Sequence, residues 1–379
     1  ACIRDIPLFA FVPSAVCSGT IPSFIFHQVE EKEFESFLRY LQDNHYRTID
    51  GDELFAALMG TCRDTEKRVI LTFDDGLRNV WAVAYPLLKR YGMKAVFYVN
   101  PSTVLESGGC GHCLEDVWAG KVSLADLITE AKERPHISWD EARAMEASGF
   151  VKIESHGWRH QICFTEDTII DFQHPDRNGN PRYRWLFSAV DAPADARLWG
   201  APVYPFRSRF DAVRYFDDAG LRGACMRFVE DNGGRAFFER SDWRTRLTEC
   251  AREYRENNRL RTVREDWISQ ELAIRDSLVR AKEKIEKELG KNSLHFAYPW
   301  SIGGPVAQLW LKELGYKTVF RYMSSWKLNR TGSNPHELGR VEGYWITSLP
   351  GTGRVSFWSK MFRRVLSVMR TYGRKSYYG

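Results

Sequence analysis

The chain has 379 residues, and 44% of its side chains are hydrophobic, which is ample for a large core. With 54 Lys and Arg against 49 Asp and Glu, its net charge of +5 is too small to indicate a nucleic-acid-binding protein. No apolar run reaches the roughly 18 residues needed to span a membrane, and the first 26 residues lack the pattern of a secretory signal.

Eight cysteines are too few in a chain of this length to form a dense disulfide framework. Cys110 and Cys113 form a CxxC pair, but no second pair follows, and the pair lies in a glycine-rich stretch rather than at a helix start. We therefore expect scattered reduced thiols and a cytoplasmic protein.

Strand and helix patterns alternate through the first part of the chain. The spacing of apolar residues predicts strands at 23–29, 46–49 and 69–73 and helices at 33–44, 52–58 and 80–91. Alternation at this pace is typical of parallel βα units. His27 lies near the end of the first strand, so we expect it to line a site there.

The strand at 69–73 runs directly into two acids, Asp74 and Asp75. The carboxyl end of a strand is where α/β sheets and barrels place their chemistry. Neighbouring side chains on a strand point in opposite directions, so one carboxylate can bind a metal while the other moves protons. The plain alternative is a strand followed by an ordinary Asp-Gly turn.

A second short strand at 151–155 ends in His156, and His160 follows four residues later. Two histidines at this spacing meet on one side of a helical turn. One carboxylate oxygen and two imidazole nitrogens are a usual ligand set for catalytic zinc. The alternative is a pair of surface histidines at a helix start, but the two strand ends together favour a metal site.

These stretches resemble the motifs of one family. Residues 72–76, Thr-Phe-Asp-Asp-Gly, are similar to a first motif, His156 and His160 to a second, and residues 296–300, Phe-Ala-Tyr-Pro-Trp, more loosely to a third. The family is that of the polysaccharide deacetylases, carbohydrate esterase family 4. The resemblance covers residues 23–160 and 270–345 and leaves out the middle of the chain.

The resemblance implies a fold and a set of roles. It implies an α/β protein, a distorted (β/α)7-type barrel over residues 1–353, with a long insertion at about 161–268 over the barrel mouth. Asp75, His156 and His160 would bind one divalent metal ion, with Zn²⁺ fitting best. Asp74 would act as general base, and a backbone N–H near Tyr298 would stabilise the oxyanion.

The chain also departs from the family pattern. Ala297 stands where the third motif usually has an arginine that holds the catalytic base, and Arg340 in the last predicted strand could serve instead. The family's late catalytic histidine has no clean match; His336 is the nearest candidate for the general acid and His295 a weaker one. Trp300 replaces the usual tyrosine.

The later segments continue the barrel pattern and end in a basic tail. We predict helices at 268–290 and 305–314 and strands at 294–298, 316–320 and 338–341. Residues 354–379 contain seven Lys and Arg, no acid and an apolar helical face. Such a segment either lies on an anionic membrane surface, which would place the protein at the inner membrane face, or docks on the barrel.

The function that these observations predict is metal-dependent removal of an N-acetyl group from a saccharide, with release of acetate. Trp158 and Trp300 could stack on a sugar ring, and His27 could line the same pocket. The substrate is a soluble or lipid-linked N-acetylated saccharide. Deformylation or O-deacetylation would use the same machinery, and a sugar-binding protein with a disabled site is the alternative from another class.

Overall fold

The computed structural model describes residues 6–61, 66–176, 179–180, 182–183, 186, 198–323 and 328–360. The chain divides into two compact units. The first, the barrel unit, comprises Ala1–His160, Ser277–Ser301 and Leu311–Gly379. The second unit comprises Gln161–Asp276 and Ile302–Trp310.

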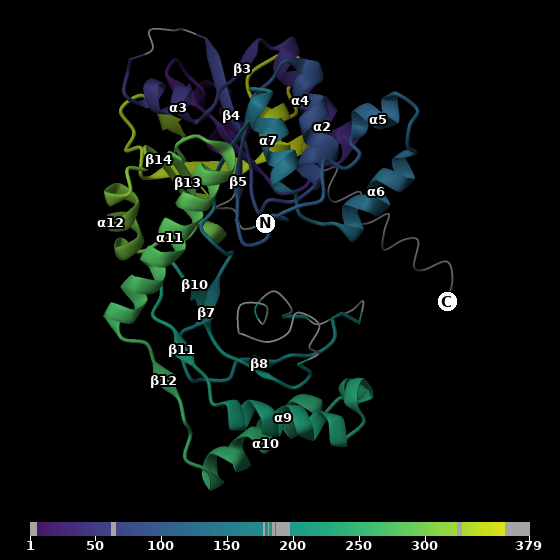
Figure 1. The fold of residues 1–379 in the computed structure, drawn as a ribbon, viewed down its shortest axis with the longest axis vertical. Coiled ribbons are helices and arrows are strands. Elements are labelled where there is room, and N and C mark those ends of the chain that lie inside the picture. The colour runs from purple at the N-terminus through teal and green to yellow at the C-terminus, as the bar shows by residue number, and fades with distance from the viewer. Residues whose placement is uncertain are drawn as a thin grey trace. The chain divides into compact units, whose positions relative to one another are not determined.

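Parallel strands of the barrel unit close into a ring (Figure 1). The order around the ring is β2 (Ser23–Phe26), β16 (Leu338–Glu342), β14 (Thr318–Met323), β13 (His295–Ala297), β6 (Val151–Ser155), β5 (Ala95–Val99) and β4 (Lys67–Phe73). β4 then pairs back with β2, and β3 (Tyr46–Thr48) joins only the start of β4. Among the described residues this is the predicted seven-stranded barrel.

Helices connect these strands and cover the barrel. They are α2 (Glu31–Asp43), α3 (Gly51–Leu58), α4 (Tyr85–Tyr91), α5 (Leu114–Trp118), α6 (Leu124–Glu133), α7 (Trp139–Ala147), α11 (Trp267–Leu289) and α12 (Pro305–Glu313). Capping boxes at Asp50 and Ser138 start α3 and α7. The predicted helix at 80–91 begins as a π-helical turn at Val80–Ala84. The connection at residues 100–136 contains α5 and α6.

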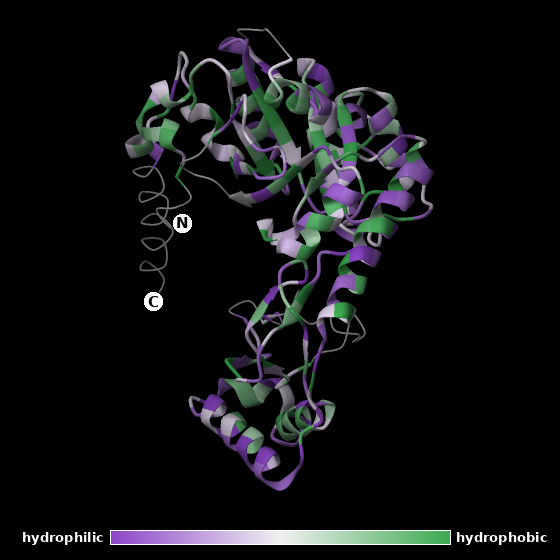
Figure 2. Ribbon diagram, turned by 90° about the vertical axis from the view of Figure 1, so that its left-hand side faces the viewer, coloured by the Kyte–Doolittle hydropathy of each residue, from purple (hydrophilic) through white to green (hydrophobic). Residues whose placement is uncertain are grey.

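Successive side chains of the barrel strands pack alternately into two different hydrophobic cores. Leu71 and Phe73 pack with the covering helices, whereas Ile70 packs with Val96 and Ala297 of other barrel strands. Figure 2 shows these strands as predominantly hydrophobic. A strand buried on both faces is expected in a parallel barrel. The alternation turns Thr72 and Asp74 to the same side as Ile70.

The second unit is built from short antiparallel strand pairs and two helices. The pairs are β7 (Ile162–Phe164) with β10 (Phe206–Ser208), β8 (Asp171–Phe172) with β9 (Pro202–Val203), and β11 (Tyr215–Phe216) with β12 (Val263–Arg264). α9 (Ala219–Asp231) and α10 (Trp243–Asn257) pack over a core of their own. The predicted insertion, residues 161–268, begins at the first residue of this unit. Its placement over the barrel mouth stays a prediction.

The start of the basic tail packs on the barrel unit. Arg354 donates hydrogen bonds to the carbonyl oxygens of Phe9 and Ala10, both in α1 (Leu8–Phe11). Phe357 is buried against Trp345. The remainder of the predicted tail, residues 361–379, lies outside the described residues.

Among the described residues, no helix combines the length and the apolar character that crossing a membrane requires.

A buried ion-pair network fixes the loop that precedes α5. Arg78 and Glu141 are both fully buried, and Nε of Arg78 donates to Oε1 of Glu141 over 3.1 Å. The same Oε1 accepts the N–H of Gly111, and Oε2 accepts the N–H of Ser138. The carboxylate thus joins the loop, the start of α7 and the segment that follows β4.

Replacement of Glu141 by alanine should destabilise the barrel unit, because it leaves a buried guanidinium with part of its charge unbalanced. We expect the free energy of unfolding to fall by about 3 kcal/mol, measured by urea unfolding followed by tryptophan fluorescence. Glu115 and Lys89 form a pair over 2.7 Å, but Glu115 is exposed and Lys89 is only half-buried. Glu115→Ala should therefore cost less than about 1 kcal/mol, and equal losses in the two variants would contradict this account.

Candidate active site

The functional side chains lie at the carboxyl ends of neighbouring strands. Asp74 and Asp75 follow β4, and His156 follows β6. β5 lies between these two strands and pairs with both in parallel. The carboxyl ends of parallel strands meet at one edge of the barrel, so residues about eighty positions apart in sequence come together.

Asp75 adopts a backbone conformation that few residues tolerate. Its φ is 72°, and that of Gly76 is 69°. Aspartate is one of the few side chains enriched in this left-handed region. The N–H of Ile137 donates to the carbonyl of Gly76 over 3.1 Å and so helps to hold the turn. The turn directs the Asp75 carboxylate away from that of Asp74.

The first histidine is fixed on both its backbone and its ring. The amide of Asn100 donates to the carbonyls of His156 and Gly157 over 2.8 and 3.1 Å. Gly157 has a φ of 77°, a left-handed conformation that glycine adopts without strain. Nδ1 of His156 lies 2.7 Å from the carbonyl oxygen of Ala297. A carbonyl can only accept, so Nδ1 carries the proton and Nε2 presents its lone pair to the site.

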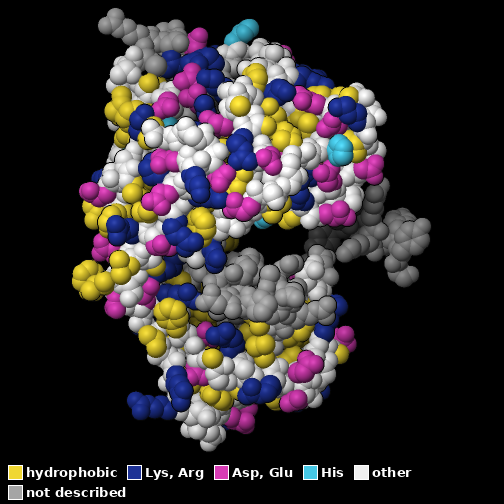
Figure 3. All heavy atoms as spheres, in the orientation of Figure 1, with side chains coloured by type: hydrophobic (Ala, Val, Ile, Leu, Met, Phe, Trp, Pro, Cys, Tyr) yellow, Lys and Arg dark blue, Asp and Glu magenta, His cyan; other side chains and the backbone are white. Residues whose placement is uncertain are grey.

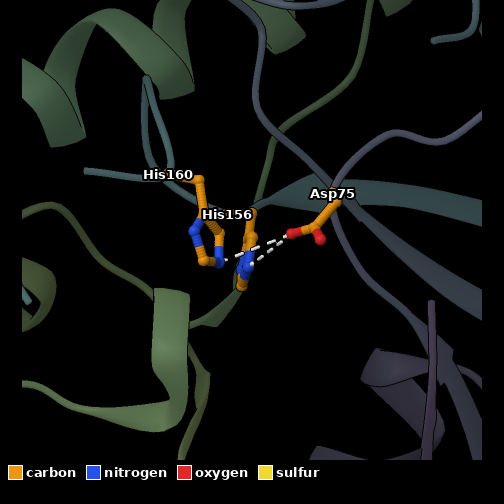
Figure 4. A group of neighbouring side chains, drawn as sticks. All are labelled: Asp75, His156 and His160. Atoms are coloured by element: carbon orange, nitrogen blue, oxygen red, sulfur yellow. Dashed lines mark ion pairs between the residues drawn. The ribbon is translucent and has the colours of Figure 1, made fainter. Parts of the chain in front are cut away.

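Three side chains present donor atoms to one point (Figure 4). Oδ1 of Asp75 lies 3.5 Å from Nε2 of His156 and 3.5 Å from Nε2 of His160. Ligands bonded tetrahedrally at about 2.0–2.1 Å are about 3.3–3.4 Å apart, so the spacing fits an ion of the size of zinc. Oδ1 is buried and accepts no hydrogen bond within the described part of the chain. A cation would satisfy this oxygen.

The electrostatics of the group favour metal binding over proton binding. Burial raises the pKa of Asp75, but the neighbouring His156, His160 and His27 outweigh it and hold this pKa below its ordinary value. Burial, together with the adjacent His156, lowers the pKa of His160 to about 4. An ionised carboxylate beside a neutral imidazole is the protonation state in which these groups bind a metal.

Asp74 is held apart from the three ligands by an arginine. Nη1 and Nη2 of Arg340 donate to Oδ1 and Oδ2 of Asp74, each over 2.7 Å, and both side chains are buried. Nη1 also donates to the hydroxyl of Thr72 over 3.1 Å. Oδ2 of Asp74 remains 3.8 Å from Nε2 of His156. Arg340 thus holds Asp74, which an arginine at the position of Ala297 was expected to hold.

Two of the predicted substrate-binding residues border this group. The ring of Trp300 lies 4.6 Å from that of His160, and 43% of its side chain is exposed. Its φ of 60° belongs to the same left-handed region as that of Asp75. His27 directly follows β2, is exposed, and is close enough to influence the pKa of both Asp75 and His160.

Two other predictions need correction. The guanidinium of Arg280 lies 4.3 Å above the ring of Trp158, and the backbone N–H of Trp158 donates to Oγ of Ser277 over 3.2 Å, so the ring face turned to α11 is not available for stacking. The N–H of Tyr298 donates to the carbonyl of Phe320 over 2.9 Å. It belongs to the pairing of β13 with β14 and is not available to an oxyanion.

The predicted general acid lies elsewhere. His336 precedes β16, and its N–H donates to the side chain of Asn334, so it lies at the amino end of the strands, opposite the site. Burial lowers the pKa of its ring. His295 begins β13, at that same amino end, and its Nδ1 lies 2.8 Å from the hydroxyl of Thr318. Neither histidine can reach Asp75, His156 or His160, so neither can serve as the predicted general acid.

Sequence reasoning overlooked Asn100 and the side chain of Thr72. Asn100 directly follows β5, between the two motif strands, and it holds the histidine turn. A polar residue at the end of a buried apolar run was the available signal. Thr72 donates to the carbonyl of Phe24 over 2.8 Å and receives Arg340.

Residues 62–174 match the model of the family described as polysaccharide deacetylase. This stretch, which contains Asp75, His156 and His160, is therefore similar to that family. A stretch of 72 residues is 42% identical to YxkH of Bacillus subtilis (strain 168), a protein with a provisional polysaccharide deacetylase name. That stretch is 19% of this chain and 26% of YxkH, so the match spans about a quarter of this relative.

Solved structures of deacetylases are similar over most of the chain. The BpsB deacetylase domain from Bordetella bronchiseptica has a TM-score of 0.51 at 12% identity, over 85% of this chain and 95% of that one. IcaB from Ammonifex degensii has a TM-score of 0.47 at 17% identity, over 88% and 97%. The Bordetella structure supports the barrel fold and, at this identity, nothing further.

The ligand group should bind one Zn²⁺ or Co²⁺ per chain. Removal of a donor by Asp75→Ala or His160→Ala should weaken binding at least about 100-fold, measured by competition with a chromogenic chelator. His174→Ala is a matched control, because His174 also lies 3.5 Å from an aspartate, Asp171, but has no place in the group. The site is refuted if wild type and His160→Ala bind the metal equally.

Proposed function

We propose that this protein hydrolyses the N-acetyl group of a saccharide and releases acetate. The proposal rests on one arrangement: Asp75, His156 and His160 could hold one cation, and the carboxylate of Asp74 lies beside them without joining them. Asp74 lies within 3.8 Å of His156 and yet is paired with Arg340 rather than with the ligand group. The similarity of residues 62–174 to the polysaccharide deacetylase family supports the same reaction.

Asp75, His156 and His160 are the residues that would hold the metal. A divalent ion there, with zinc best suited to one oxygen and two nitrogen donors, would supply Lewis acidity toward an amide carbonyl and lower the pKa of water. The Ala297 carbonyl keeps Nε2 of His156 turned to the site through Nδ1. The clamp from Asn100 holds the turn that carries this ring.

Asp74 acts as the general base. Arg340 holds both of its oxygens, which fixes the plane of the carboxylate and leaves Oδ2 facing His156. Water adds its hydroxyl to the acyl carbon, and Asp74 takes the proton that this water loses. The C–N bond then breaks, the proton passes to the amine nitrogen, and acetate leaves. His336 lies at the other end of the strands and takes no part in this scheme. The proton that reaches the amine is the one that Asp74 took from water.

The exposed rings beside the ligands suit a sugar. Trp300 is partly exposed at 4.6 Å from His160, where its face can cover the apolar side of a pyranose ring. His27 adds a polar group at the same edge. A soluble or a lipid-linked N-acetylated saccharide fits this arrangement, and removal of a formyl or O-acetyl group would use the same residues.

Conversion of Asp74 to asparagine should abolish the proton transfer without removing a metal ligand. We expect kcat for acetate release from N-acetylated oligosaccharides to fall by about 10³-fold, with the metal content unchanged. Asp140, an exposed aspartate paired with Arg143, provides a control in which Asp140→Asn keeps full activity. Metal-loaded wild type that releases neither acetate nor formate from any saccharide would instead favour a sugar-binding protein.

Trp300 should contribute to substrate binding rather than to the chemical step. We expect Trp300→Ala to raise KM about tenfold with little change in kcat, because a stacked aromatic ring contributes about 1 kcal/mol or more. Trp118→Ala, at a similarly exposed tryptophan of α5, should leave both constants unchanged. A pure loss of kcat in Trp300→Ala would show that this side chain acts on the reacting groups instead.

A further inference from the structure

Three large apolar side chains are exposed where α1 meets the start of the C-terminal segment. Trp358 is 75% exposed, Val12 45% and Phe11 40%. The ring of Phe357 lies 4.5 Å from that of Phe11 and 5.1 Å from that of Trp358. Phe11 and Trp358 therefore flank the buried Phe357, and we call them, together with Val12, the terminal patch.

The fold holds the terminal patch open to solvent. Phe357 is buried, with its ring stacked on Trp345 at 6.4 Å. Arg354 ties the same segment to the carbonyls of Phe9, Ala10 and Ser348. Because Phe357 is fixed inward by these contacts, its neighbour Trp358 is turned outward.

The sequence on either side of the terminal patch carries little negative charge. The sequence from Ile6 to Phe26 contains no charged residue, and residues 354–379 contain no Asp or Glu. Basic residues follow the patch in sequence, at Lys360, Arg363, Arg364, Arg370, Arg374 and Lys375. On the face of the molecule seen in Figure 3, by contrast, basic and acidic side chains are interspersed.

We propose that the terminal patch docks on an anionic lipid surface. Tryptophan is enriched at membrane–water interfaces, and an uncharged apolar cluster can enter the headgroup region. The basic residues that follow would pair with anionic headgroups. A second copy of this chain is a poorer occupant, because two such patches would bring two basic segments together. This surface goes beyond the proposed hydrolysis and does not depend on it.

The test compares vesicle binding of full-length variants. Wild type should co-sediment with vesicles of phosphatidylcholine and phosphatidylglycerol, more weakly with phosphatidylcholine alone, and less as salt is added. The double variant Phe11→Ser, Trp358→Ser should lower the partition coefficient at least about tenfold. Ile128→Ser, at a 45% exposed isoleucine of α6, is the control that should bind like wild type.

Unchanged thermal unfolding of the double variant would show that the loss of binding is not a loss of fold. Equal vesicle binding by wild type and the double variant would overturn the proposal. Failure of wild type to bind anionic vesicles would overturn it as well, and would leave a protein partner or residues 361–379 as the cover of the patch. Acetate release plays no part in this readout, so the outcome is separate from that of the proposed function.

Discussion

Oδ1 of Asp75 is a buried carboxylate oxygen that faces two imidazoles and has no hydrogen-bond donor of its own within the described chain. A buried charge of this kind destabilises a fold unless a cation balances it. Protonated histidines could do so, but burial lowers the pKa of His160 and makes its neutral form dominant. A shared metal ion would satisfy all three side chains together, and the position that the left-handed turn gives the Asp75 carboxylate would then explain this turn.

The separation of two adjacent aspartates depends on the same geometry. Asp74 continues the alternation of Ile70 and Thr72, so it lies on the side where Arg340 can reach it from β16. Asp75 leaves the strand through a left-handed turn and joins the histidines instead. The arginine that the third motif lacks is thus supplied by another strand of the closed barrel. The backbone carbonyl of Ala297 has a different role, because it accepts a hydrogen bond from the Nδ1–H of His156.

Strand periodicity predicted parallel βα units, and ligand chemistry linked Asp74, Asp75, His156 and His160, whereas the seven-stranded barrel was predicted from the resemblance to the deacetylase family. The predicted strands at 294–298 and 338–341 already place His295 and His336 at their amino ends, as the structure does. Parallel-strand geometry could therefore have excluded both histidines from the site, whereas contacts between distant residues could not be predicted. The cover on Trp158 comes from Arg280, more than a hundred residues away. Likewise, residues 302–310 join the second unit through contacts that no local pattern reveals.

The central claim is that one cation is shared by Asp75, His156 and His160 while Asp74 stays outside its coordination. Anomalous diffraction at the zinc absorption edge, from crystals soaked in Zn²⁺, tests this most directly. The account predicts one peak at about 2.0–2.2 Å from Oδ1 of Asp75 and Nε2 of each histidine, with Asp74 still paired to Arg340. A peak bonded to Asp74 in place of Asp75, or no peak between these strand ends, would contradict it.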